Sequence, residues 1–268
     1  MKYIIMCLIA AAVCLATGWL LTALLNRKGR FSGPVRILLS IAFAVLLMAA
    51  AAAGYLGIYS HADEEAFAAL DSDESVQVTQ VTNGWYFDGP GEDAAIIFYP
   101  GAKVETEAYA PLLHRLAREG EDCFLVSMPF HMAIFGMDRA EDIIQNYDYD
   151  SWYLAGHSMG GMTAALYVCD HPEQADGVIL LAAYPTKDLP DQVSLCSIYG
   201  SQDGCLDHRE YDQMHWPADS REVIIQGGNH AGFGNYGMQK GDGQASVSAE
   251  EQQKQTAAVI KEWIDDAR

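Results

Sequence analysis

A serine in a glycine-rich turn is the strongest chemical signal in the sequence. Ser158 stands in the run Gly156-His-Ser-Met-Gly160, a G-x-S-x-G motif between an apolar segment, 152–155, and a helical segment, 161–170. A serine at a tight strand-to-helix turn holds its hydroxyl above the sheet, and small neighbours leave room for the strained backbone. The helix that follows directs free N–H groups toward the same point. The motif therefore predicts that Ser158 is a nucleophile.

A serine nucleophile needs a base and an acid, and two later loops supply them. Asp203 follows the apolar segment 195–199, and His230 follows the segment 222–225. The order serine, acid, histidine is the one expected when a triad begins at such a turn. We expect His230 to take the serine proton and return it to the leaving group, while Asp203 orients the imidazole. Asp207 is the nearest rival acid.

Backbone N–H groups are expected to stabilise the negative oxygen that forms during the reaction. The N–H of Met159, directly after the serine, is one predicted donor. The second is expected from the loop after the segment 95–99, where Ala102 and Lys103 are both placed for it and Ala102 is preferred. The sequence shows no spacing typical of a metal site or of a phosphate-binding loop. We therefore expect no metal and no cofactor.

Short apolar runs alternate with helical patterns around these residues. After a hairpin with strands at 76–81 and 85–87 and a turn at Asn83-Gly84, the pattern predicts six more strands and five helices. The strands are 95–99, 123–127, 152–155, 178–182, 195–199 and 222–225, and the helices are 105–118, 139–147, 161–170, 208–214 and 249–265. Continuously apolar strands that alternate with helices indicate a parallel sheet covered on both faces. Its ligand site is expected beyond the carboxyl ends of the strands.

Four segments together resemble the α/β-hydrolase superfamily, and in particular the group called α/β hydrolase fold-5, which is related to dienelactone-hydrolase-like proteins. They are 98–104, 156–160, 199–204 and 227–234. The resemblance covers roughly 76–268 and implies a doubly wound, mostly parallel sheet, a catalytic triad and hydrolysis of an ester-like bond. This chain has Ser158 where dienelactone hydrolases have cysteine, and the resemblance fixes no substrate.

Two long apolar runs precede this region. The runs 3–25 and 37–58 contain no charged residue, and each exceeds the ~20 residues that a helix needs to cross a bilayer. They predict a two-helix transmembrane hairpin over 1–60, followed by an acidic connector over 61–75 and a hydrolase domain over 76–268. A signal peptide is the alternative for the first run, but no clear small-residue cleavage site follows it.

The basic residues predict how the hairpin is oriented. The loop between the two apolar runs carries Arg27, Lys28, Arg30 and Arg36, and the first acidic residue of the chain is Asp63. Positive residues stay on the cytoplasmic side of a membrane. We therefore expect an integral protein of the cell membrane with its catalytic domain on the extracytoplasmic side.

Charge and cysteine content bear on two further questions, nucleic-acid binding and disulfide formation. The chain has 36 Asp and Glu against 16 Lys and Arg, a net charge of −20, and so acidic a chain repels phosphate backbones. Nucleic acid is therefore excluded as a partner. Cys196 and Cys205 are near enough in sequence to meet across a loop, so a disulfide is one reading and free thiols are the preferred one.

The sequence thus predicts a membrane-anchored serine hydrolase that cleaves a small-molecule carboxylic ester, thioester or amide through an acyl-enzyme intermediate. An acyltransferase with the same triad is an alternative, because water and another acyl acceptor differ only in the shape of the pocket. A non-catalytic binding protein built on a hydrolase fold is the third reading. The oligomeric state is left open by the sequence.

Overall fold

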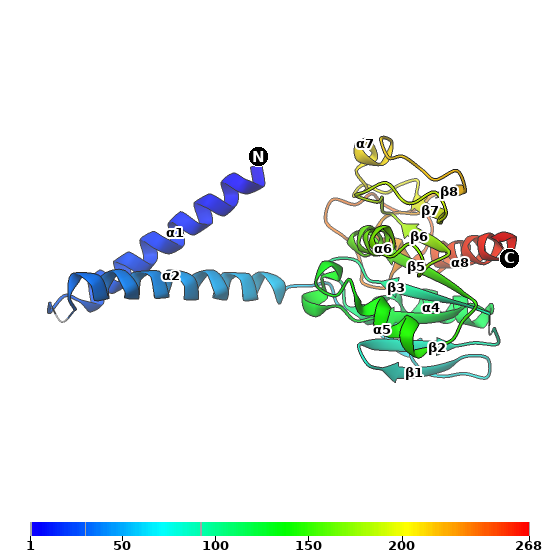
Figure 1. Ribbon diagram of the computed structural model, residues 1–268, viewed down its shortest axis with the longest axis horizontal. Coiled ribbons are helices and arrows are strands. Elements are labelled where there is room, and N and C mark those ends of the chain that lie inside the picture. Colours follow the sequence, from blue (N-terminus) through cyan, green and yellow to red (C-terminus); the bar gives the residue numbers. More distant parts are fainter. Residues whose placement is uncertain (1, 30, 92, 268) are drawn as a thin grey trace. The chain divides into compact units, whose positions relative to one another are not determined.

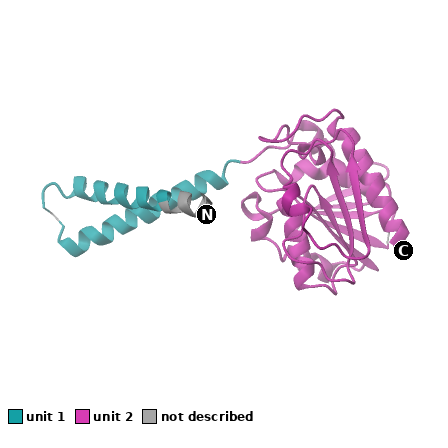
Figure 2. Ribbon diagram, turned by 90° about the horizontal axis from the view of Figure 1, so that it is seen from above, with its two compact units in different colours: residues 1–58 teal, residues 59–268 magenta. Residues whose placement is uncertain are grey.

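The computed structural model describes residues 2–29, 31–91 and 93–267. Contacts within the chain divide it into two compact units, 1–58 and 59–268, which are coloured separately in Figure 2.

Unit 1 is a pair of helices, α1 (Lys2–Leu25) and α2 (Gly33–Leu56), that pack against each other. A Cβ atom at Gly18 would lie 2.5 Å from the Ser40 carbonyl oxygen, so this glycine lets the two backbones approach closely. Helix α2 begins earlier than the charge-free run because Pro34 lies in its first turn, where the missing N–H of proline is tolerated. Arg36 is therefore helical, and Arg30 lies outside the described residues.

Helix α2 is, among the described residues, the helix long and apolar enough to cross a membrane, and Ile9–Leu25 adds a shorter apolar helix. The expectation of two spanning helices is therefore supported by length and composition for α2 alone. The same test is passed by some signal sequences and buried helices, so it does not by itself establish a membrane segment.

Unit 2 is built on a sheet of eight described strands in the order β1-β2-β4-β3-β5-β6-β7-β8. Strands β1 and β2 pair antiparallel, β2 pairs antiparallel with β4, and all the other pairs are parallel. Figure 1 shows β1 at one edge and β8 at the other. The strands are β1 (Gln77–Val81), β2 (Gly84–Asp88), β3 (Ala94–Tyr99), β4 (Asp122–Val126), β5 (Ser151–His157), β6 (Gly177–Leu181), β7 (Ser194–Gly200) and β8 (Ser220–Ile225).

Helices cover both faces of this sheet (Figure 2). Buried side chains of α4 and α8 share one apolar core with one face, and those of α5 and α6 share a second core with the other. The prediction of a doubly wound, mostly parallel sheet is confirmed. The helices of unit 2 are α3 (Glu64–Ala68), α4 (Ala110–Arg118), α5 (Arg139–Asn146), α6 (Met159–Asp170), α7 (His208–Tyr211) and α8 (Ala249–Ala267), with short 3-10 turns η1 (Thr106–Tyr109), η2 (Pro129–His131), η3 (Ala133–Phe135) and η4 (Ala231–Phe233).

Two local predictions need correction. The hairpin turn lies one residue earlier than expected, because Val81 pairs with Gly84 and Gly84 already belongs to β2. A Cβ atom at Gly84 would lie 2.0 Å from the Leu125 carbonyl oxygen, so the glycine serves close strand pairing rather than the turn. The single helix expected over 105–118 is divided into η1 and α4, because Pro111 starts a new helix.

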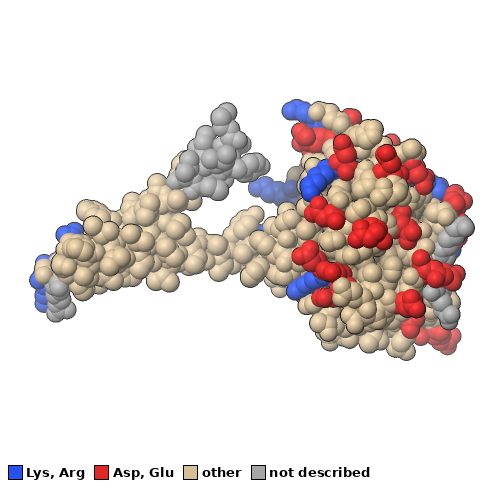
Figure 3. Space-filling view, viewed as in Figure 1, with Lys and Arg blue, Asp and Glu red and all other residues tan. Residues whose placement is uncertain are grey.

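The cysteines in the described part of unit 2 are free thiols. Cys196 is buried in β7 and Cys205 lies in the loop beyond that strand, so the disulfide reading of this pair is wrong. Asp and Glu side chains are spread over the face of unit 2 seen in Figure 3, in keeping with the acidic composition.

Candidate active site

The turn at Ser158 joins β5 to α6 in a strained backbone conformation. Ser158 has φ 52° and ψ −121°, a region that non-glycine residues rarely occupy and that costs on the order of 1–3 kcal/mol. The glycines around it are required by space. A Cβ atom at Gly156 would lie 2.4 Å from the Gly160 carbonyl carbon, and one at Gly160 would lie 2.0 Å from the Tyr99 carbonyl oxygen. The motif therefore brings the start of α6 directly against the end of β3.

Asp203 and His230 form a buried pair at the ends of β7 and β8. The Nδ1 atom of His230 lies 2.9 Å from Asp203 Oδ2 and 3.2 Å from Oδ1. The side chain of Asp203 is fully buried and that of His230 is 3% exposed. Asp203 Oδ1 also accepts hydrogen bonds of 2.8 Å from the amides of Cys205 and Leu206. These contacts fix the carboxylate on the Nδ1 side of the imidazole.

The pKa of Asp203 reflects two opposing effects. Burial alone would raise the pKa of this carboxyl, but the hydrogen bond and charge of His230 and the two backbone amides outweigh burial and lower it. Asp203 is therefore ionised at neutral pH and able to stabilise a positive imidazole.

His157, the residue before Ser158, lies against His230. The rings of His157 and His230 have centroids 4.5 Å apart. The Nε2 atom of His230 is buried and has no hydrogen-bond partner among the described residues. The turn that carries Ser158 follows His157 directly, and the Ser158 hydroxyl makes no hydrogen bond to His230 among the described residues. Catalytic hydrogen bonds are often long or unformed before substrate binds.

His157 is held as a neutral side chain behind this pair. The Gly101 N–H donates to the Tyr109 hydroxyl (3.1 Å), which leaves the hydroxyl proton free to donate to His157 Nδ1 (2.8 Å). Complete burial, and then the nearby charge of His230, lower the pKa of His157 well below its usual value. His157 is thus a poor base, and its side chain serves packing.

The two N–H groups predicted to form the oxyanion hole are free to donate to a substrate. Neither the Met159 N–H nor the Ala102 N–H donates to another described residue. The neighbouring amides are already used, because Gly101 donates to Tyr109 and Lys103 donates to the carbonyl of His131 (2.6 Å). Of the two donors that the sequence left open in this loop, Ala102 is the one that remains available.

Asp242 supports the loops of the candidate site, and the sequence did not reveal this residue. It lies in a glycine-rich loop, where it reads as an ordinary surface acid. Its Oδ1 atom accepts from the amides of Gly204 and His230, both at 3.1 Å, and its Oδ2 accepts from Ala231 at 2.9 Å. One carboxylate therefore ties the loop of Asp203 to the loop of His230. Backbone acceptors leave no spacing pattern, so only the fold could identify this residue.

Asp242→Asn is expected to lower kcat about 10–100-fold while KM changes little. The new amide offers one acceptor in place of two and sets an NH₂ group against backbone N–H donors, so the two loops separate slightly. A shift of about 1 Å in catalytic groups costs on the order of 10²-fold in rate. Steady-state kinetics measure the effect, with Asp212→Asn as the control because Asp212 is exposed and its side chain makes no hydrogen bond to another described residue. An unchanged kcat would contradict this role.

A metal ion is a second reading of the same cluster. Single ligand atoms of Asp203, Cys205 and His230 lie within 4.8 Å of one another. However, the Asp203–His230 hydrogen bond uses the atoms that an ion would take. Burial, and then the charges of Asp242 and Asp203, raise the pKa of the Cys205 thiol and disfavour the thiolate that a metal requires. The arrangement therefore suits a triad better than a metal centre.

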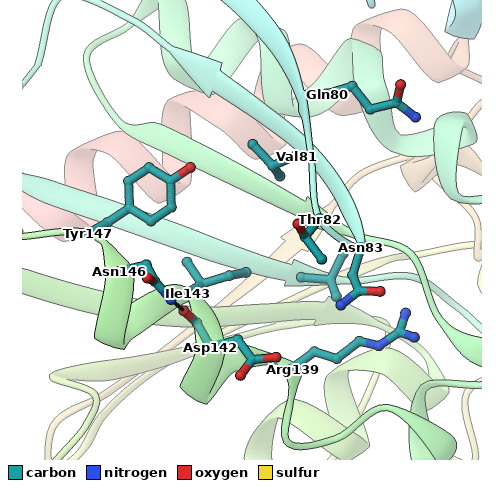
Figure 4. A pocket seen from close by; sticks show the side chains of 10 residues that line it. Gln80, Val81, Thr82, Asn83, Arg139, Asp142, Ile143, Asn146 and Tyr147 are labelled. Carbon is teal, nitrogen blue, oxygen red and sulfur yellow. Dashed lines mark hydrogen bonds between the residues drawn. The ribbon is translucent and has the colours of Figure 1, made fainter.

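A cavity of about 550 Å³ lies apart from these residues, between the turn of the first hairpin and α5 (Figure 4). Its lining includes Asn83, Asp142 and Tyr147, and none of the triad candidates contributes to it. Its walls hold no candidate nucleophile next to a base, so we assign no chemistry to it.

Comparison with known proteins bears on the family and the fold. Residues 95–254 match the sequence profile of the alpha/beta hydrolase family. No curated protein matches the chain.

Solved structures share the fold at low sequence identity. A serine hydrolase involved in carbazole degradation is 14% identical, with a TM-score of 0.53 over 71% of this chain and 99% of that one. Dienelactone hydrolase from Anabaena variabilis is 16% identical, with a TM-score of 0.52 over 72% of this chain and 99% of that one. Est1E from Butyrivibrio proteoclasticus is 13% identical, with a TM-score of 0.50 over 72% of this chain and 100% of that one.

The family match covers more than half of the chain, and the structural matches extend over nearly the full length of their partners. The resemblance inferred from the motifs is thereby confirmed. This chain belongs to the alpha/beta hydrolase family.

Proposed function

We propose that this chain is a membrane-anchored serine hydrolase that cleaves a carboxylic ester, thioester or amide through an acyl-enzyme intermediate. Ser158 is the nucleophile, His230 the general acid and base, and Asp203 the residue that orients His230. The N–H groups of Met159 and Ala102 form the oxyanion hole. The family and its esterase-like structural neighbours support hydrolysis as the reaction class.

One observation carries the proposal. A buried carboxylate–imidazole pair, 2.9 Å apart, leaves the second imidazole nitrogen buried beside a strained serine turn and without a partner among the described residues. A buried polar atom without a partner costs about 1–3 kcal/mol, so such atoms in native proteins tend to serve a function. In the proposed reaction, this nitrogen accepts the proton of Ser158.

The reaction follows from these placements. The Ser158 oxygen bonds to the acyl carbon while its proton moves to His230 Nε2, and the carbonyl oxygen becomes an anion held by the two N–H groups. The carbonyl re-forms as the bond to the leaving group breaks, and His230 donates its proton to that group. Water then attacks the acyl-serine with His230 again as the base, which releases the acid and restores Ser158.

The exposed side chains of unit 1 support the proposal of a membrane anchor. Large apolar side chains of both helices face outward, including Trp19 (60% exposed), Leu38 (67%) and Leu46 (63%). Soluble proteins rarely expose continuous apolar surface on this scale. We infer that the hairpin lies in the cell membrane, with its basic loop in the cytoplasm and unit 2 on the extracytoplasmic side.

An active-site-directed fluorophosphonate tests the nucleophile. We expect it to label the full-length protein at Ser158 with one equivalent, because the probe needs a serine activated by a base and phosphorylates it irreversibly. Labelled peptides are identified by mass spectrometry. Ser151→Ala serves as the control, because Ser151 lies at the other end of the same strand and should leave labelling intact. Equal labelling of wild type and Ser158→Ala would remove Ser158 from this role.

A further inference from the structure

The loop between β4 and α5, residues 128–137, exposes large apolar side chains. Phe130 is 61% exposed, Ile134 47% and Phe135 57%, and the two phenylalanine rings pack edge to face with centroids 6.0 Å apart. Half of the exposed large apolar side chains in the described part of unit 2 lie in this one loop. We call Phe130, Ile134 and Phe135 the aromatic loop tip. Burying a side chain of this size is worth about 1.5–3 kcal/mol, so this tip is suited to a partner surface.

The backbone of this loop is strained where it presents the tip. Phe130 and His131 have φ values of 56° and 54°. A left-handed conformation costs a non-glycine residue roughly 1–2 kcal/mol. The chain thus tolerates strain at Phe130 and still leaves its ring in solvent, although the same ring would gain stability if it were buried.

The loop is fastened to the first residues after α2. The ring of Tyr59 stacks on the ring of His131 with centroids 3.8 Å apart. Ser60 is fixed beside it, because its N–H donates to the Lys103 carbonyl (2.8 Å) and its carbonyl accepts from the Glu105 N–H (2.9 Å). Helix α2 ends at Leu56, so at most about 10 Å of chain separates its last residue from Tyr59. Only Gly57 and Ile58 therefore separate the last residue of α2 from the residue that stacks on this loop.

The same loop also contacts the elements that carry the oxyanion donors. The His131 carbonyl accepts from the N–H of Lys103, the residue after Ala102. The turn η3, which contains Ile134 and Phe135, packs against α6, whose first residue is Met159. The loop that carries the aromatic loop tip therefore contacts Tyr59, three residues after α2 in the sequence, and elements of the proposed active site.

We propose that the aromatic loop tip enters the interfacial layer of the bilayer crossed by α2, and that the substrate is an acyl ester of an amphiphile held in that bilayer. This inference rests on the proposed function. Exposed aromatic and aliphatic rings are the side chains that enter this layer. The partner surface is zwitterionic rather than anionic lipid, because a domain with this excess of acidic residues is repelled by anionic headgroups.

Photocrosslinking tests the contact without relying on activity. The full chain is reconstituted in phosphatidylcholine vesicles with benzoylphenylalanine at position 130 or 135. Position 224 is the control, because Ile224 is also an exposed apolar residue (40%) but lies on β8, an edge strand. We expect lipid adducts at 130 and 135 at least tenfold above those at 224. Adducts to another protein chain, or lipid adducts no more frequent than at 224, would overturn the proposal.

Kinetics test the substrate class. We expect the double variant Phe130→Ser, Phe135→Ser to lower, by at least about tenfold, the ratio of the rate on a long-chain ester in phosphatidylcholine vesicles to the rate on a short water-soluble ester, because tenfold corresponds to about 1.4 kcal/mol of lost interfacial binding. Ile224→Ser should leave that ratio within twofold. An unchanged ratio in the double variant would overturn the inference, whereas hydrolysis of neither ester by wild type would overturn the proposed function and leave the crosslinking result standing.

Discussion

Replacing Ser158 with alanine is expected to lower kcat for a p-nitrophenyl ester by at least about 10⁴-fold, with little change in KM. Alanine removes the oxygen of the proposed nucleophile but leaves the Met159 N–H and the Ala102 N–H in place. Loss of the nucleophile from a serine triad costs on the order of 10⁶ in kcat, and the residual rate comes from the oxyanion hole and binding. The substitution removes a single oxygen atom, so thermal unfolding should change little.

Steady-state kinetics on the full-length protein measure this loss, and a stopped-flow experiment adds a second readout. Wild type should release p-nitrophenol in a burst equal to the enzyme concentration if deacylation is slow, and Ser158→Ala should show no burst. Ser151→Ala is the matched control and should retain kcat within twofold. A kcat for Ser158→Ala within tenfold of wild type would mean that another group attacks the ester.

The sheet was predictable because its strands carry their own pattern. Strands β3, β4 and β6 are apolar at nearly every position, which only burial on both faces explains, and all of their residues are buried. The glycines of the motif at Ser158 were equally informative, since each fills a place where a side chain would collide. Boundaries were less accurate where a glycine that suggests a turn is required by close strand pairing instead, as Gly84 is in the first hairpin.

The positions of supporting groups could not be read from the sequence. Asp242 acts through backbone N–H groups of loops that are distant in sequence, and any residue supplies such a donor. The choice between Ala102 and Lys103 as the oxyanion donor depended on the hydrogen bond from the Lys103 N–H to the His131 carbonyl. The hydrogen-bond partner of His157 is Tyr109, a residue with no motif around it. These are three-dimensional facts, and they became visible only with the loops in place.

Asp203→Asn is expected to lower kcat by about 10⁴-fold at neutral pH. The amides of Cys205 and Leu206 both donate to Asp203 Oδ1, so they will hold the oxygen of the new amide at that position. Its NH₂ group then takes the place of Oδ2, 2.9 Å from His230 Nδ1, and donates to that nitrogen. The imidazole is forced to carry its proton on Nε2, where it can no longer accept one from Ser158. A wrong tautomer of this kind costs about 10⁴ in kcat.

The stability difference between wild type and Asp203→Asn should depend on acid pH in a defined direction. The pKa of Asp203 is lower in the folded protein than its ordinary value of 3.8, so the ionised carboxylate favours the folded state. This contribution is complete above the unfolded pKa and is lost as the pH falls through the folded pKa. The difference in unfolding temperature between wild type and Asp203→Asn should therefore be constant near neutral pH and narrow below about pH 4. Calorimetry at a series of pH values measures it.

The rival acid provides the matched control for this prediction. Asp207 is exposed and its carboxylate accepts from the Arg209 N–H at the start of α7, so Asp207→Asn should retain kcat within about threefold. The control removes the same charge from the same loop, which separates the tautomer effect from a general change in the field at His230. A large loss of kcat in Asp207→Asn together with a small one in Asp203→Asn would make Asp207 the acid. It would also show that this loop rearranges before Ser158 reacts.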